Sequence, residues 1–202
     1  MLTRTLIRLA DRFRNRHSDF QPLFQPYTGS EVVSLDCEMT GLDTKNDHIV
    51  SIGAVKIDGN QVKTGGSFEA MIDHRQWLSE ESIRIHRIRK VDLDDAVSIE
   101  TAVIAMIEFI GNRPILGYNL RFDLKFLDRY TKPLLVFSLP NQMIELSDLY
   151  RKSVVSKRPD VVPHLGFEEI LDDLDVPIFG RHTALGDATT VAMAYIKLKR
   201  SR

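Results

Sequence analysis

Cysteine is nearly absent from this chain, with Cys37 the only one among 202 residues. No internal disulfide can form, and a zinc site built from several cysteines is excluded. Long apolar runs are also missing, since the most apolar stretch covers residues 102–110 and contains Glu108. A bilayer-spanning helix needs about 20 apolar residues, and no charge-flanked apolar signal core opens the chain. We therefore expect a cytoplasmic protein with no membrane partner.

The chain also has little excess charge of either sign. Its 27 lysines and arginines nearly balance 28 aspartates and glutamates, for a net charge of −1. This balance argues against a protein that binds nucleic acid through a broad positive surface. The charge balance is compatible with a nucleic acid that the protein contacts only at a short end or through metal ions. The length and the 43% apolar content fit a chain that buries one sizeable core.

The first thirty residues differ in composition from the rest. They contain five arginines and two aspartates, a local net charge of +3. Apolar side chains recur at helical spacing at Leu2, Leu6, Leu9 and Phe13. The pattern predicts a basic amphipathic helical arm and linker over 1–30, followed by one domain over 31–202. The arm could pack on the domain, contact a phosphate backbone or act as a transit peptide.

From residue 31 on, β-branched runs alternate with helical patterns. Runs at 32–35, 49–57 and about 67–72, with a turn at 58–60, predict three adjacent antiparallel strands. Further predicted elements are a helix over 99–110, a strand over 115–117, a helix over 121–130 stopped before Pro133, a possible strand over 144–146, and helices over 166–174 and 185–198. Alternating helices and strands are typical of an α/β fold.

The first candidate for chemistry is the pair Asp36 and Glu38, which follow a β-branched run and precede Thr40-Gly41. In a strand, residues two apart point to the same face, so both carboxylates project together. Two such charges repel unless a cation lies between them, and hard divalent ions prefer carboxylate oxygens. Similar acid pairs at 92–94 and 173–175 show that the spacing alone is weak. The strand end beside a loop is what distinguishes Asp36 and Glu38.

Two further candidates lie at predicted helix starts. Asp123 follows the strand that ends at Gly117, and Asp187 opens the last helix five residues after His182. The helix dipole alone favours an acid at such positions. Together with a carboxylate-bound metal, however, His182 would supply a base that titrates near neutrality.

These three segments, in this order, resemble the three motifs of the His-bearing DEDD (DEDDh, DnaQ-like) 3′–5′ exonuclease superfamily. The resemblance covers residues 31–198 and implies an RNase H-like fold, with a mixed central sheet of three antiparallel strands plus parallel strands, flanked by helices. The segment 77–92 is similar to the epsilon proofreading-subunit type, although Arg87 replaces a common glycine. Residues 37–43 are instead similar to oligoribonucleases, which leaves the choice of DNA or RNA open.

The resemblance also implies a site. Two divalent ions, Mg²⁺ or Mn²⁺, would be held by the four carboxylates, with His182 as general base. Thr40, Gly41 and Leu42 would line the pocket for the terminal nucleotide, and Met39 and His86 would flank the substrate. Asn119 would either contact the substrate or cap a helix. The metal ligands in this set are Asp36, Glu38, Asp123 and Asp187.

The expected activity is removal of nucleoside 5′-monophosphates from the 3′ end of single-stranded DNA, as in a DNA polymerase III epsilon-like proofreading or repair nuclease with a polymerase as its partner. One alternative is an exoribonuclease of the same superfamily that acts on short RNA or RNA 3′ ends. An alternative of another class is a non-catalytic module that binds nucleic acid or a polymerase. The oligomeric state stays open.

Overall fold

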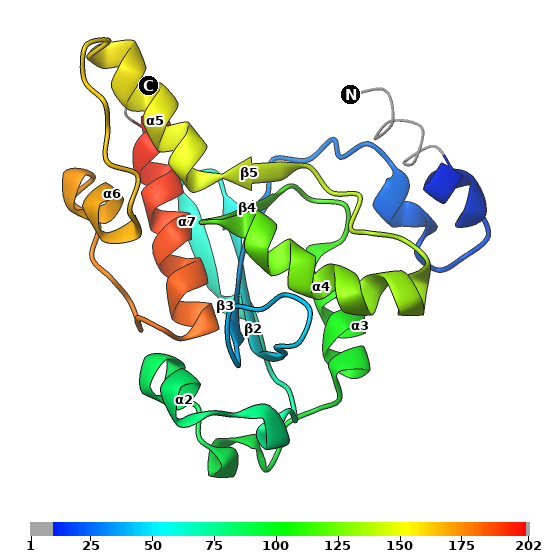
Figure 1. The fold of residues 1–202 in the computed structure, drawn as a ribbon. Coiled ribbons are helices and arrows are strands. Elements are labelled where there is room, and N and C mark those ends of the chain that lie inside the picture. The colour runs from blue at the N-terminus through cyan, green and yellow to red at the C-terminus, as the bar shows by residue number, and fades with distance from the viewer. Residues whose placement is uncertain (1–9, 201–202) are drawn as a thin grey trace.

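The structure is a computed structural model that describes residues 10–200. A five-stranded sheet in the order β3-β2-β1-β4-β5 lies at its centre (Figure 1). β1 (Val32–Met39), β2 (Ile49–Asp58) and β3 (Gln61–Met71) are antiparallel neighbours. β4 (Ile115–Gly117) runs parallel to β1, and β5 (Met143–Glu145) runs parallel to β4. The predicted mixed sheet is confirmed.

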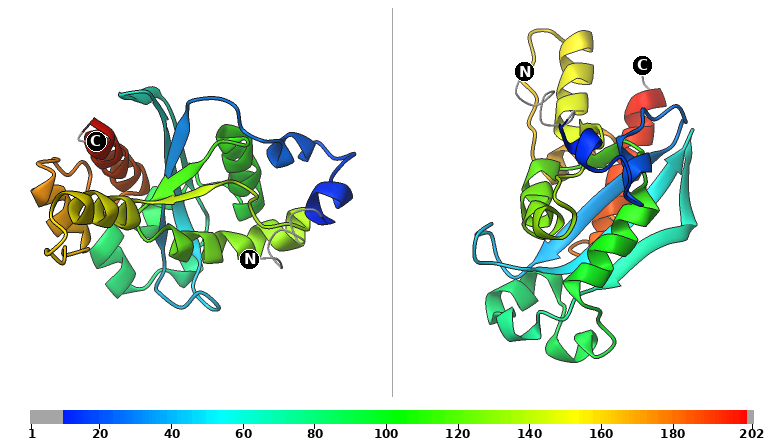
Figure 2. Two further views of the ribbon diagram at one scale, coloured as in Figure 1. Left: turned by 90° about the horizontal axis from the view of Figure 1, so that it is seen from above. Right: turned by 90° about the vertical axis from the view of Figure 1, so that its right-hand side faces the viewer.

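Helices cover both faces of the sheet, as Figure 2 shows most clearly from above. α3 (Ile99–Ile110) and α4 (Leu120–Leu135) lie on one face. α5 (Leu146–Lys157), α6 (Phe167–Asp173) and α7 (Ala184–Arg200) pack on the other. α2 (Glu80–His86) lies beyond the end of the sheet at which α7 begins (Figure 1). Short 3₁₀ helices cover Gln21–Phe24, Arg75–Trp77 and Lys90–Leu93.

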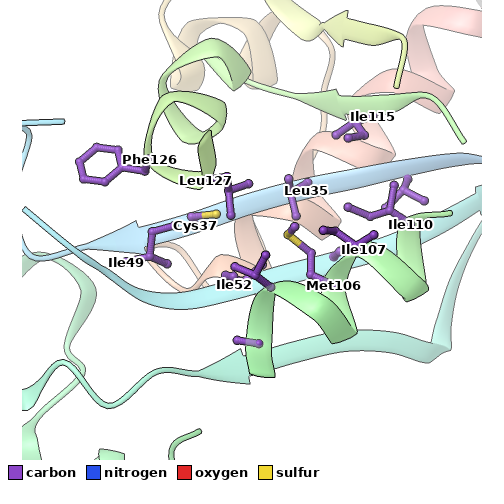
Figure 3. Packing of buried hydrophobic residues seen from close by; sticks show 14 of the residues in the cluster. Leu35, Cys37, Ile49, Ile52, Met106, Ile107, Ile110, Ile115, Phe126 and Leu127 are labelled. Carbon is purple, nitrogen blue, oxygen red and sulfur yellow. The ribbon is translucent and has the colours of Figure 1, made fainter. Parts of the chain in front are cut away.

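β1 divides its side chains between the two helical layers. Leu35 and Cys37 are buried with Ile52 of β2 and Met106 of α3 (Figure 3). Because successive strand residues alternate between the faces, the even-numbered residues point toward α7. The alternation therefore sends the two carboxylates of β1 to the face that α7 covers.

Three helical features differ from the sequence expectations. α4 does not stop before Pro133 but continues to Leu135, which is buried in the core beside Phe137. The free energy gained by burying this apolar residue exceeds the loss from the one backbone hydrogen bond that Pro133 cannot make. The sequence patterns did not predict α2 or α5; α5 begins at Leu146, where a strand was expected to continue.

The edge strand β3 is longer than predicted, because it starts at Gln61 directly after the turn at Gly59. Gly59 has a φ of +58°, which glycine adopts at no steric cost. The tight turn lets Gln61 pair with Asp58, so the hairpin continues into polar residues that the apolar pattern did not mark.

The described part of the predicted arm packs on the domain. Residues 10–14 are helical, and the earlier part of the arm lies outside the described residues. Leu23 is buried, and the rings of Phe20 and Phe24 lie 5.9 and 5.0 Å from the ring of Phe137. This part of the segment adds apolar surface to the core. Within residues 10–200, no helix has the length and apolar character needed to cross a membrane.

Candidate active site

Carboxylates from separate parts of the chain meet where β1 ends and α7 begins. Oxygen atoms of Asp36, Glu38 and Asp187 all lie within 4.8 Å of one another. Asp123, in the first turn of α4, is buried beside them, and its Oδ1 accepts a hydrogen bond of 3.1 Å from the backbone N–H of Cys37. The structure thus brings together the acids that the sequence placed in three distant motifs.

A glycine in β2 allows α7 to approach this closely. Gly53 pairs with Asp36 across the sheet. A Cβ atom on Gly53 would lie 2.5 Å from the Cα of Leu185, and closer still to the backbone of Ala184. The sequence analysis missed this residue, although a glycine inside a β-branched run is a known sign of close backbone approach. Gly53 therefore lets the first turn of α7, with Asp187, lie directly on the sheet beside Asp36.

Burial raises the pKa of each acid in the cluster, and repulsion from neighbouring acids adds to the effect at Asp36, Glu38 and Asp123. Burial raises the pKa of Asp36 well above its ordinary value, and the charges of Asp123, Glu38 and Asp187 raise it further. Burial likewise raises the pKa of Asp123 to about 8 and that of Glu38 to about 7. The pKa of Asp187 is also raised, again mainly by burial. Deprotonating this group of acids is therefore unfavourable unless a cation compensates their charge.

The residues present fit a divalent metal ion. Asp187 Oδ2 accepts hydrogen bonds from the Arg181 side chain at 2.9 Å and from the His182 backbone N–H at 3.2 Å. Asp187 Oδ1 is buried and has no hydrogen-bond partner among the described residues. A buried carboxylate oxygen without a donor, next to two other carboxylates, matches the oxygen ligands that hard divalent cations take.

Arg181 is a functional candidate that the sequence analysis missed. Its guanidinium lies 4.8 Å from the centre of the Phe167 ring and hydrogen-bonds Asp187. Its positive charge lowers the pKa values of Asp36 and Glu38, in opposition to burial. Arg181 thus binds one oxygen of Asp187, while the other oxygen has no hydrogen-bond partner among the described residues. No sequence signal separates it from other surface arginines.

His182 lies in the loop before α7, with a φ of +61°. Burial lowers the pKa of its imidazole, and the charge of Arg181 lowers it further. The ring is therefore predominantly neutral near pH 7, the state in which it can accept a proton.

A cavity of about 750 Å³ opens over the cluster. All the residues that the resemblance placed near the substrate line it, namely Met39, Thr40, Gly41, Leu42, His86 and Asn119. The Thr40 N–H donates to the His48 carbonyl, and the Thr40 hydroxyl donates to Asp47. The Thr40 side chain and amide therefore fix the loop after β1.

His86 and Asn119 lie in different parts of the cavity wall. His86 is buried, its Nδ1 accepts from the Ile88 N–H at 3.0 Å, and its Nε2 has no partner among residues 10–200. Asn119 stands at the start of α4 with a φ of +55°, and its side chain makes no capping hydrogen bond. Its backbone N–H donates to Glu145 at 2.9 Å.

The raised pKa values predict an unusual pH dependence of stability. In the presence of a chelator, we expect the melting temperature to fall as the pH rises from about 5 to about 8. In this window the folded protein keeps protons on carboxyls with pKa values near 7 to 8, while the unfolded chain, with pKa values near 4, has released them. Calorimetry at several pH values measures the slope.

Glu38→Gln should show a smaller fall over the same window, because it removes one of the titrating groups. Adding Mn²⁺ should raise the melting temperature of the unsubstituted protein more at pH 8 than at pH 5, since the metal competes with protons for the same oxygens. A melting temperature that rises with pH in chelator, in both proteins, contradicts the raised pKa values.

Known proteins with similar sequences and folds are nucleases and polymerases. The Exonuclease family (RNase_T) matches residues 33–195 of the chain. DNA polymerase III subunit epsilon of Rickettsia felis is 30% identical over 173 residues, which cover 84% of this chain and 74% of the relative. A PolC-type DNA polymerase III of Thermotoga petrophila is 27% identical over 186 residues, which cover 89% of this chain but 13% of the relative.

Solved structures share the fold. E. coli exonuclease I in complex with a dT13 oligonucleotide superposes with a TM-score of 0.67 at 18% identity, over 86% of this chain and 41% of that one. The RNase H-like fold and the resemblance to DnaQ-like exonucleases of the epsilon type are thereby confirmed. Since the family match extends from β1 into α7 and so includes every carboxylate of the cluster, the chain is a member of the exonuclease family.

Proposed function

We propose that this protein is a metal-dependent 3′–5′ exonuclease that removes nucleoside 5′-monophosphates from the 3′ end of single-stranded DNA. The observation that carries the proposal is the carboxylate cluster of Asp36, Glu38 and Asp187, with Asp123 and His182 beside it, under one open cavity. The Rickettsia relative is a DNA polymerase subunit, and the E. coli structure holds a DNA oligonucleotide. Both favour DNA over RNA as the substrate.

Asp36, Glu38, Asp123 and Asp187 would hold two divalent ions, Mg²⁺ or Mn²⁺. When bound, such ions supply positive charge that stabilises the phosphate oxygens during phosphodiester hydrolysis. The near-neutral net charge of the chain fits this arrangement, because the protein then needs to contact only the few nucleotides at the strand end.

The chain's own residues would orient the reactants and move a proton. His182, neutral near pH 7, accepts the proton of the attacking water. Arg181 keeps Asp187 in position, because its guanidinium donates a hydrogen bond of 2.9 Å to the Asp187 carboxylate. The loop of Thr40, Gly41 and Leu42 receives the terminal nucleotide, and the exposed Leu42 offers apolar surface to its base.

His182→Ala is expected to slow hydrolysis by roughly 10² to 10⁴-fold, the usual effect of losing a general base. The loss should appear in kcat, because the imidazole acts on the proton and not on substrate affinity. His164→Ala, at an exposed histidine in the loop before α6, is the matched control and should leave kcat unchanged. A His182→Ala enzyme as fast as the unsubstituted one removes His182 from this role.

The activity itself is tested by following mononucleotide release from 5′-labelled and 3′-labelled single-stranded DNA and RNA, with Mg²⁺, Mn²⁺ or chelator. We expect shortening that begins at the 3′ end, requires metal and is faster on DNA. Faster shortening of RNA would favour the exoribonuclease alternative. No shortening of either strand overturns the proposal and favours a binding module.

The biological setting is also a proposal. The chain spans a small part of the PolC-type relatives and most of the epsilon relatives. We infer from the epsilon relatives that a polymerase is a partner in replication or repair. The single cysteine favours a cytoplasmic location.

A further inference from the structure

The cavity has an aromatic wall that the proposed chemistry does not use. Trp77 is the only tryptophan of the chain. It lines the same cavity as the carboxylates, yet 52% of its surface is exposed. A large aromatic side chain left half exposed on the wall of a binding cavity is a candidate ligand contact.

Trp77 is held in place by a column of rings. Its indole stacks on the His48 ring, with centroids 4.7 Å apart and planes 25° apart. His48 in turn lies 4.8 Å from the His74 ring and forms a hydrogen bond of 3.3 Å with the Tyr130 hydroxyl. His74 Nδ1 is 2.6 Å from the Ile49 carbonyl oxygen, which anchors the column to β2. The column therefore presents a rigid indole, and a rigid ring loses little entropy when a ligand stacks on it.

The cavity wall also carries exposed apolar side chains. Leu42 and Ile85 line the cavity too, and both are more than half exposed. One cavity thus combines a buried acidic cluster with exposed apolar and aromatic side chains. A ligand that carries phosphates and planar apolar groups on one flexible chain matches both parts, and single-stranded nucleic acid is such a ligand.

We propose that Trp77 is a stacking platform for a nucleobase that lies upstream of the 3′-terminal nucleotide. This inference rests on the proposed exonuclease function, because the carboxylates determine where the terminal phosphodiester lies. Stacking on an indole tolerates any base, since every base offers a π face. Trp77 would therefore strengthen strand binding without selecting a sequence.

The kinetic test compares two substrates. For a short oligothymidylate with Mg²⁺, Trp77→Ala should raise KM by about 5- to 100-fold, the range expected when one base loses its stacking partner, and leave kcat unchanged. The nitrophenyl ester of thymidine 5′-monophosphate has no upstream base, so its hydrolysis should be unaffected. Trp77→Phe should restore most of the affinity for the oligothymidylate.

Phe179→Ala is the matched control, because Phe179 is exposed to a similar degree but is not among the residues that line the cavity. It should not change KM for the oligothymidylate. Unchanged ester hydrolysis by Trp77→Ala also shows that this variant is folded. If Trp77→Ala binds the oligothymidylate as well as the unsubstituted protein, the stacking role is wrong while the exonuclease function stands. If the unsubstituted protein hydrolyses neither substrate, the proposed function itself fails.

The single tryptophan also gives a direct spectroscopic readout. With Ca²⁺ in place of Mg²⁺, oligothymidylate should quench the fluorescence of the unsubstituted protein. An abasic strand of equal length carries the same phosphates and should quench far less. Equal quenching by both strands would show that Trp77 does not stack on a base and would overturn the inference.

Discussion

Asp187→Asn is expected to abolish mononucleotide release while leaving the metal-free protein at least as stable as the unsubstituted one. Asp187 Oδ1 is buried without a hydrogen-bond partner among the described residues and lies in the three-carboxylate cluster. An amide removes one anionic ligand from this cluster, so the metal charge that hydrolysis requires is bound more weakly. The amide also removes a buried acid whose pKa burial raises, and it removes the charge that repels Asp36 and Glu38 in the metal-free state.

Two measurements check this expectation, the rate of mononucleotide release with Mg²⁺ or Mn²⁺ and the melting temperature in chelator. Asp175→Asn is the matched control, because it makes the same acid-to-amide change at a fully exposed side chain that lies 3.8 Å from Lys197. It should change neither quantity appreciably, since exposed ion pairs contribute about 0 to 1 kcal/mol. Normal turnover by Asp187→Asn would remove the cluster from the proposed chemistry.

Gly53→Ala is expected to lower both stability and activity, although it adds a single methyl group far from Asp187 in sequence. The new Cβ would lie 2.5 Å from the Cα of Leu185, well inside van der Waals contact. Backbone cannot rotate away as a side chain can, so α7 must shift from β2. Forced repacking of this kind typically costs about 1 to 3 kcal/mol, and a displacement of about 1 Å at an active site can cost 10²-fold in rate.

Thermal unfolding and the rate of mononucleotide release measure the two effects. Gly65→Ala is the control, because Gly65 lies in β3 and a Cβ there meets no atom of residues 10–200 within 4 Å. It should leave the rate unchanged and the melting temperature nearly so. If Gly53→Ala retains full activity, the close approach of α7 to β2 is not what positions Asp187.

The two substitutions are expected to affect activity and stability differently. Asp187→Asn should remove activity without loss of stability, whereas Gly53→Ala should reduce both. The difference follows from their places in the fold, since one changes a charge inside the cluster and the other moves the helix that carries it.

Local patterns in the sequence were sufficient for much of the fold. The β-branched runs of β1 and β2, the periodicity of α3 and its end at Gly111, and the short strand β4 all lie where the patterns predicted them. These elements are determined by which side chains are apolar and by residues that end helices, and both are visible in a few neighbouring positions. α4 deviates because the buried Leu135 extends the helix past Pro133, a tertiary effect that no local pattern contains.

By itself, the sequence determined the kinds of chemical group available and their order along the chain. It identified Asp36 and Glu38 as a pair on one face of a strand, Asp123 and Asp187 at helix starts, and His182 near Asp187. Only the tertiary structure decided that these groups meet, because the distances between them depend on packing across the sheet. Gly53 leaves the space that α7 needs to lie on β2.

The positions of Arg181 and Trp77 were likewise set by contacts with residues distant in sequence. Arg181 contacts Phe167, and Trp77 contacts His48. Local sequence patterns extend over a few neighbouring residues, whereas a site assembled from several chain segments depends on long-range contacts.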